Sequence, residues 1–255
     1  MQIENAKEWR QKYQLNRDDN ITIWRYLSLE KWLSMLTTQK MVFSKLAEFS
    51  DRNEVEYLIN ILTKDNKKQL GKSLVDHIAH LKHDYYAVCW NAKEGECRSL
   101  WYAYTGNARL GVAIKSSVKS FCSSVQFTKT LPNCYKVAYG VITEDPENLQ
   151  MDEISLCCKS IAYESENEIR FLLNNSTARL SGFDSNPNMP LVFSPPEEQP
   201  RFIQFDCDLN KLTEGFMISP FASEWQKEAI LETTRKLAPE IMDKYIKSSI
   251  NEHNS

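Results

Sequence analysis

Residues 163–173 read YESENEIRFLL and carry a charged side chain at every second position from Glu164 to Arg170. Successive side chains of a β-strand point to opposite faces, so this stretch predicts a strand with one charged face and one core face. The predicted charged face carries Glu164, Glu166, Glu168 and Arg170. The predicted core face carries Tyr163, Ile169 and Phe171. We expect this strand to belong to the central sheet.

Three carboxylates side by side on a strand repel one another, which costs free energy unless cations or a ligand lie nearby. The strand therefore either lines a polar site or forms a solvated edge that Lys and Arg neighbours balance. Lys159 is a candidate for this neutralising role. The pattern alone leaves both interpretations open.

The composition sets broad limits on the class of protein. The chain has 255 residues, 42% of them hydrophobic, which is enough to bury the core of one large or two small domains. The net charge of -3 gives no overall basic field of the kind that attracts nucleic acid, although a local basic groove is compatible with it.

The expected location is the cytoplasm, with no membrane partner. No apolar run approaches the roughly 18 residues that a membrane-spanning helix needs, and the first residues lack the basic and apolar regions of a secretory signal. The seven cysteines are odd in number and irregular in spacing, which is typical of reduced thiols and not of a disulfide framework.

Apolar periodicity and turn residues predict the order of the elements. Strands are expected over residues 21–27, 40–44, 85–90, 111–114, 125–127, 135–141, 163–173, 201–205 and 216–220. Helices are expected over residues 29–38, 54–62, 68–83, 94–104 and 223–237, with a last one from Pro239. This order predicts an α+β protein with a mixed or antiparallel sheet core and flanking helices. We expect a single domain over residues 21–250, preceded by a helix or arm over 1–20 and interrupted by a long loop or insertion over 174–200.

Four sequence blocks follow one another between residues 20 and 240. They are Trp24-Arg25-Tyr26, then Phe43-Ser44 with Phe49, Asp51 and Glu54, then Cys89-Trp90 with Glu94, Glu96, Trp101 and Tyr104, and finally Tyr163, Glu164, Glu166, Glu168 and Arg170. This joint order resembles the bacterial family known as domain of unknown function 2971. The chain departs from the family pattern at Arg52, where relatives have Pro, and at Asn91, where many relatives have His. We therefore expect no role that depends on that His.

An Arg on the first strand, an aromatic-Ser second strand and a late Glu-x-Glu strand are also similar to the layout of ADP-ribosyltransferases, which include DNA- and RNA-modifying bacterial toxins. This resemblance implies an ADP-ribosyltransferase-like fold, NAD as cofactor, and a protein or nucleic acid as acceptor. It also suggests a role as a toxin or in phage defence. Cleavage of the nicotinamide–ribose bond develops positive charge on the ribose, which a neighbouring carboxylate stabilises.

The resemblance also implies a role for each candidate residue. Glu168 would be the essential carboxylate, and Glu166 would orient or deprotonate the acceptor. Arg25 would hold the NAD pyrophosphate through two parallel hydrogen bonds, with Ser44 supporting the site. Arg170 would keep the carboxylates in place. The aromatic residues expected to stack on nicotinamide or base are Tyr26, Trp101 and Tyr104. On this interpretation Glu168→Gln abolishes activity and leaves the thermal midpoint nearly unchanged.

Other interpretations of the same residues are equally concrete. The acidic strand would be a charge-matched face with Arg25 as its cross-strand partner, or the protein would be a non-catalytic sensor or interaction module. A metal-dependent nuclease would need Mg²⁺ or Mn²⁺ and would gather Asp51, Glu54, Glu166, Glu168 and Lys159.

Three further groups of residues carry weaker signals. Histidines 77, 80 and 83 lack a fourth ligand at suitable spacing, so no metal site is expected there. Cys89 lacks a recognisable His partner for nucleophilic catalysis. Glu94 and Glu96 are expected to cap the helix that follows them or to close the same pocket.

Overall fold

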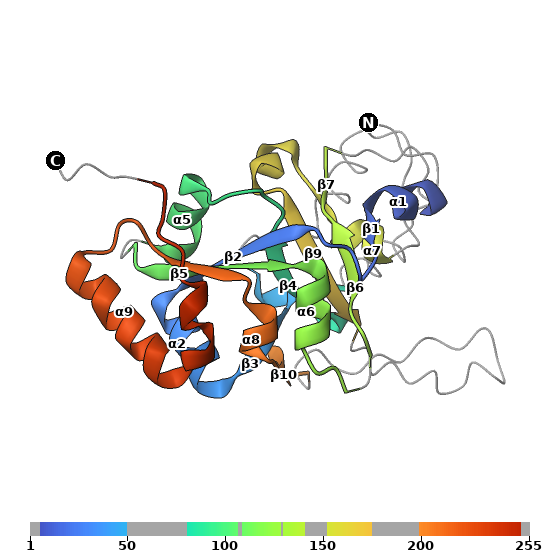
Figure 1. Ribbon diagram of the computed structural model, residues 1–255. Coiled ribbons are helices and arrows are strands. Elements are labelled where there is room, and N and C mark those ends of the chain that lie inside the picture. The colour runs from blue at the N-terminus through green and yellow to red at the C-terminus, as the bar shows by residue number, and fades with distance from the viewer. Residues whose placement is uncertain are drawn as a thin grey trace.

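The computed structural model describes residues 6–49, 81–106, 109–128, 130–140, 152–174 and 199–250 (Figure 1). In these ranges helices and strands together form the α+β architecture that the sequence predicts. The strands of the main sheet are β1 (Gln14–Leu15), β2 (Thr22–Ser28), β3 (Lys40–Lys45), β4 (Tyr85–Asn91), β5 (Gly111–Ser117), β6 (Asn133–Lys136), β9 (Glu168–Asn174), β10 (Phe202–Asp206) and β11 (Gly215–Ile218).

The main sheet is antiparallel at every pairing described. Its strand order is β1-β6-β9-β4-β2-β5-β11, and β3 joins β4 while also pairing with β10. A separate pair, β7 (Ala138–Tyr139) and β8 (Cys158–Lys159), is parallel. The expectation of a mixed or antiparallel sheet with flanking helices is confirmed.

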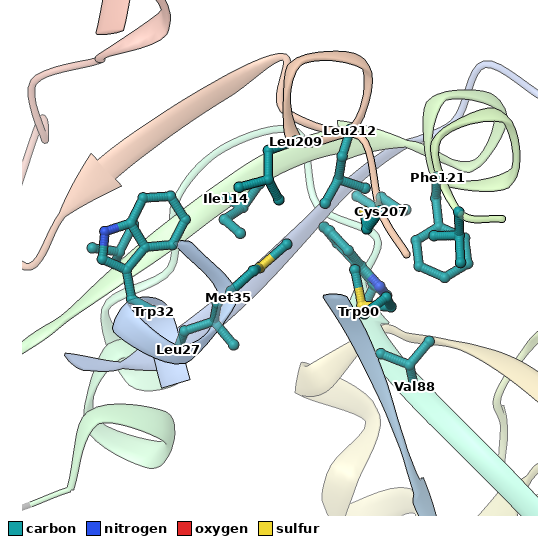
Figure 2. Packing of buried hydrophobic residues seen from close by; sticks show 14 of the residues in the cluster. Leu27, Trp32, Met35, Val88, Trp90, Ile114, Phe121, Cys207, Leu209 and Leu212 are labelled. Carbon is teal, nitrogen blue, oxygen red and sulfur yellow. The ribbon is translucent and has the colours of Figure 1, made fainter. Parts of the chain in front are cut away.

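Helices cover both faces of the sheet (Figure 1). The helices that contribute residues to the main hydrophobic core are α2 (Leu29–Thr38), α6 (Val118–Ser124), α8 (Leu209–Leu212) and α9 (Glu224–Leu237), followed by the 3-10 helix η5 (Pro239–Lys244). Figure 2 shows Trp32 and Met35 of α2 in one core with Phe121 of α6 and with Leu209 and Leu212 of α8. The opposite face is covered by α5 (Arg98–Thr105), and a third cluster contains Trp9 of α1 (Ala6–Tyr13) and Ile154 of α7 (Asp152–Leu156).

One edge of β4 is shared by two strands. Trp24 of β2 is the register partner of Asn91, whereas Ser44 of β3 is the partner of Ala87. Between these two points, residues 88–90 of β4 pair with neither β2 nor β3. We call this divergence of β2 and β3 along β4 the fork. On its other edge β4 pairs along its full length with β9, which brings Glu168 opposite Asn91.

The acidic stretch is only partly a strand, which corrects the sequence-based prediction. Residues Ile161–Glu166 form the 3-10 helix η3, and β9 begins at Glu168. The Ser160 side chain accepts a hydrogen bond from the Ala162 amide at the start of η3, and Asn167 ends it in the left-handed conformation (φ 44°). This turn carries Glu164 into solvent, which avoids three carboxylates on one strand face. Tyr163 is 40% exposed and does not enter the core.

Three smaller boundaries also differ from prediction. The helix expected over residues 94–104 begins at Arg98, because residues 94 and 95 form a bend and Cys97 has an extended backbone. Residues 125–127 form no strand beyond an isolated bridge at Val125. The segment after Pro239 is a 3-10 helix and not an α-helix.

Several predictions concern residues beyond the described ranges. The helix at 54–62, most of the helix at 68–83, Asp51 and Glu54, and most of the loop at 174–200 fall there. In the described ranges, no helix is both long and apolar enough to cross a membrane.

Candidate active site

Glu168 is the centre of a buried network of charges. Its Oε2 lies 2.6 Å from Nζ of Lys159, and its Oε1 lies 2.9 Å from both Nε and Nη2 of Arg170. The side chains of Glu168 and Arg170 are 3% and 1% exposed. Residues two apart on a strand share a face, so the alternation correctly placed Glu168 with Arg170, and Ile169 and Phe171 in the core. The predicted neutralising role of Lys159 agrees with this geometry.

Neighbouring groups fix this network in place. Arg170 donates from Nη1 to the carbonyl of Leu156, and its guanidinium lies 5.8 Å from the centre of the Phe49 ring. The amide of Glu168 donates to the hydroxyl of Tyr139 over 2.8 Å. The Cys89 side chain also hydrogen-bonds to the Glu168 carboxylate. Burial raises the pKa of Glu168, but the charges of Arg170 and Lys159 outweigh burial and lower the pKa to about 2. Glu168 is therefore a fixed negative charge at neutral pH and a weak base.

Glu166 lies at the edge of the same network and is more accessible. It ends η3, its side chain is 25% exposed, and its Oε2 lies 3.0 Å from Nζ of Lys159. Its backbone carbonyl accepts a hydrogen bond of 2.9 Å from Nδ2 of Asn91. Asn91 thus holds the turn before β9 at the position where many members of the resembled family carry His. Lys159 contacts both carboxylates and brings Glu166 and Glu168 together.

The predicted stacking residues form one aromatic group, of which only part is accessible. The Tyr26 ring lies 4.9 Å from the Trp101 ring and 6.4 Å from the Tyr104 ring, measured between ring centres. Trp101 is fully buried, whereas Tyr104 is 39% exposed. Burial raises the pKa of Tyr104, and the charges of Glu168 and Glu166 raise it further. Tyr104 is therefore the ring of this group that both faces solvent and interacts with the acidic residues.

Arg25 projects from the opposite side of β2, at the fork. Its neighbours Ile23 and Leu27 belong to the main core, and its Nη1 lies 2.8 Å from Sδ of Met41. The guanidinium lies 6.0 Å from the centre of the Trp90 ring. Arg25 is partly exposed, and in the described part of the chain it forms no ion pair with a carboxylate.

The predicted cross-strand pairing of Arg25 with the acidic strand is wrong. Strand β4 lies between β2 and β9, and Arg170 and Lys159 neutralise Glu168 instead. Burial lowers the pKa of Arg25, while interactions with Cys89 and Tyr104 oppose this shift. Both of these residues also interact with Glu168. Arg25 and Glu168 lie on the two strands that flank β4, Arg25 on the main-core face of the sheet and Glu168 on the other face.

Ser44 and Glu96 have different relations to this site. Ser44 is the register partner of Ala87 and by alternation faces the side of the sheet that carries Cys89 and Arg170. Glu96 does not cap α5. Its carboxylate accepts hydrogen bonds from Nε1 of Trp101 and from residues 248–250 near the C-terminal end of the described chain.

Sequence reasoning missed Cys89 and Tyr139 as partners of Glu168. Cys89 reaches the site because it is the register partner of Arg170, and Tyr139 because β7 pairs with β8. Pairing between distant strands is not readable from local periodicity. The alternation of β4 did carry one usable signal, since Cys89 and Asn91 interrupt an otherwise apolar strand.

No group of His, Cys, Asp and Glu suited to a metal ion occurs in the described ranges, and the acids Asp51 and Glu54 of the nuclease hypothesis lie outside them. Glu166 and Glu168 are instead bridged by Lys159. Comparison with known proteins identifies no relative of this chain, since no family model, no curated protein and no solved structure matches it.

Proposed function

We propose that this protein binds NAD at the fork and acts as an ADP-ribosyltransferase-like enzyme. The observation that carries the proposal is a partly exposed guanidinium, that of Arg25 on β2, and an ionised carboxylate, that of Glu168 on β9, on the two strands that flank β4 at the fork. Arg25 has no ion pair with the carboxylates of the described ranges, so its guanidinium is available for an anionic ligand. A partly buried guanidinium suits a pyrophosphate, which it can contact through two parallel N–H donors.

In the proposed reaction the two carboxylates have different roles. Glu168 keeps its negative charge because its pKa is lowered to about 2, and this charge would stabilise the positive ribose that forms as nicotinamide leaves. Glu166 is the more exposed of the two carboxylates, which suits a group that orients or deprotonates the acceptor. Tyr104 would stack on the nicotinamide or the base, and the wider fold would then be of the ADP-ribosyltransferase type.

Release of nicotinamide from NAD tests this function. We expect the purified protein to release nicotinamide slowly in buffer and faster when the acceptor is present. Glu166→Gln leaves the Glu168 network intact, so we expect it to fold normally and to lower transfer by roughly 100-fold or more. If the wild-type protein releases no nicotinamide either alone or with cell extract as a source of acceptor, the proposal is wrong.

A second candidate is a non-catalytic interaction module, and one observation favours it. Both oxygens of Glu168 are already paired, and its side chain is 3% exposed. A buried and fully paired carboxylate can hold a fold together without touching a ligand. The two candidates differ in a simple way, because an interaction module would neither bind NAD nor depend on Arg25.

A further inference from the structure

Two arginines and two aromatic residues form a cluster at one end of the molecule, outside the candidate active site. We call Arg98, Tyr102, Arg109 and Phe221 the Arg–aromatic patch. The rings of Tyr102 and Phe221 lie 4.7 Å apart. The guanidinium of Arg109 lies 4.8 Å from the Tyr102 ring and 5.7 Å from the Phe221 ring. The guanidinium of Arg98 lies 5.8 Å and 6.0 Å from the same two rings.

The patch is exposed although its parts come from three segments of the chain. Arg98 and Tyr102 are one turn apart on α5, Arg109 precedes β5, and Phe221 lies between β11 and α9. Both arginines are exposed, and Tyr102 is 36% exposed. In the described ranges no carboxylate forms an ion pair with Arg109. The patch therefore presents guanidinium groups and rings to solvent together.

The backbone holds Arg109 in an unfavourable conformation. Its φ is 50°, in the left-handed region that costs free energy for a residue other than glycine. Its amide donates to the carbonyl of Gly106 over 3.1 Å. Its own carbonyl accepts a hydrogen bond of 2.6 Å from the Ser219 hydroxyl, and the same hydroxyl accepts one from the Phe221 amide. These contacts fix Arg109 beside Phe221 before any ligand arrives.

A guanidinium that lies over a ring keeps its N–H edge free for a phosphate oxygen and its outer face free for a nucleobase. Arg109 is such a group, and beside the exposed Tyr102 ring it offers neighbouring sites for a phosphate and a planar base, as in proteins that bind single strands by stacking. Arg98 lies over the same two rings and donates from Nη2 to the Tyr102 hydroxyl. Trp225, 69% exposed in the first turn of α9, adds another ring a few residues after Phe221. A duplex hides the faces of its bases, so it would use only the phosphate contacts.

From these contacts we propose that the Arg–aromatic patch binds single-stranded nucleic acid. Its position relates it to the candidate active site, because Tyr102 and Tyr104 belong to the same helix and Tyr104 contacts Tyr26. We infer that a strand held at the patch also serves as the acceptor. This role as acceptor rests on the proposed function, whereas binding itself does not.

Fluorescence anisotropy with a labelled single strand of about 15 nucleotides tests the inference without NAD. We expect binding that weakens as salt rises. Arg109→Asn removes the charge and keeps a residue that tolerates the left-handed backbone, and we expect roughly ten-fold weaker binding. The slope of log affinity against log salt should fall by about 0.7 for each phosphate that the variant no longer neutralises. Phe221→Leu removes the ring and keeps the apolar volume, so it should weaken binding with an unchanged salt slope.

Arg235→Gln is the matched control, because Arg235 is exposed on α9 and pairs with Glu232 away from any described ring contact. We expect this variant to bind as the wild type does, and the thermal midpoints of all variants show whether they fold. The inference is overturned if the wild type does not bind the strand, or if Arg109→Asn binds as tightly as Arg235→Gln. Equal affinity for a duplex, or preference for an acidic peptide, would overturn it too. Because the assay omits NAD, failure of nicotinamide release leaves its result unaffected.

Discussion

Glu168 keeps a negative charge inside the protein because two cations contact its two oxygens. Lys159 lies on one side and Arg170 on the other, at 2.6 and 2.9 Å. Removing one member of such a network takes a charged partner from the buried groups that remain, which costs far more than losing an exposed pair. The sequence-based expectation that Glu168→Gln barely changes stability therefore has to be replaced.

We expect Glu168→Gln to lower the free energy of unfolding by about 3–5 kcal/mol, because Lys159 and Arg170 would stay buried and would each lose their ion pair with Glu168. Glu166→Gln is the control. Its side chain is 25% exposed and makes a single pair with Lys159, so its loss should cost less than about 1 kcal/mol. Urea unfolding of the two variants beside the wild type measures both values. Equal stability of the two variants would show that Glu168 is not held as described.

The same ion pairs predict how stability depends on pH. The pKa of Glu168 is lowered from an ordinary 4.5 to about 2, so its contribution is fully present above pH 4.5. This contribution is lost as the pH falls from about 4.5 toward 2. The gap in unfolding free energy between wild type and Glu168→Gln should therefore narrow over that range. A gap that stays constant in denaturation experiments down to pH 2 would contradict the assignment.

Local alternation was sufficient to predict some residues of the site and not others. A period of two placed Glu168 with Arg170 on one face and Ile169 with Phe171 in the core, because this part of the stretch is a strand. Before Asn167 the strand prediction was wrong, because these residues form a 3-10 helix. A side-chain cap begins this helix and a left-handed residue ends it. Charge repulsion was recognised from the sequence, but its relief by a change of backbone was not.

At the scale of elements, Glu96 fastens the chain near its described end to the start of α5. Its carboxylate accepts hydrogen bonds from the hydroxyls of Ser248 and Ser249 and from the amides of Ser249 and Ile250. Ile246 and Ile250 pack against the cluster that contains Tyr26 and Trp101. Burial raises the pKa of Glu96, but these hydrogen bonds and that from Trp101 lower it overall. One carboxylate thus holds a segment that borders the aromatic group of the candidate site.

We expect Glu96→Ala to release residues 246–250 from the body of the protein. Hydrogen bonds to a charged group contribute about 1.5–3 kcal/mol each, so amide exchange in this segment should become roughly ten-fold faster or more. Hydrogen-exchange mass spectrometry of the C-terminal peptide measures the change. Glu94→Ala is the control, since Glu94 is exposed and lies two residues earlier. Unchanged protection in Glu96→Ala, or equal loss in both variants, would contradict this function of Glu96.

Most strands and helices of the described chain were predictable because their apolar periodicity is strong. Strand β2 and helix α2 follow one another as expected, with Ser28 as the last residue of the strand. Helix α6 was missed, since Val118–Ser124 contains four polar residues in seven. The Ser117 cap and the packing of Val118 and Phe121 stabilise this helix. The packing depends on the folded sheet, so the local sequence did not reveal it.

At the scale of the whole molecule, the fork depends on contacts that no local pattern contains. Strands β2 and β3 are successive strands separated by α2, and both pair with β4, at different points along it. The order of helices and strands along the chain was enough to predict the α+β class. The order of strands in the sheet was not predictable, because it depends on pairing between distant segments. At the fork Arg25 contacts Met41 of β3 and lies 6.0 Å from the Trp90 ring of β4, so its surroundings come from both neighbouring strands.

The central claim is that NAD binds at the fork through Arg25, and a thermal shift on three proteins tests it. A ligand at about 100 times its dissociation constant stabilises the folded state by about 2.7 kcal/mol. We therefore expect NAD to raise the midpoint of the wild type by several degrees. Arg25→Lys keeps the charge but loses the two parallel donors, so its shift should be much smaller. Arg235→Lys, the same change at an exposed arginine, should shift as the wild type does. No shift with NAD, an equal shift in Arg25→Lys, or a shift with Mg²⁺ or Mn²⁺ alone would contradict the claim.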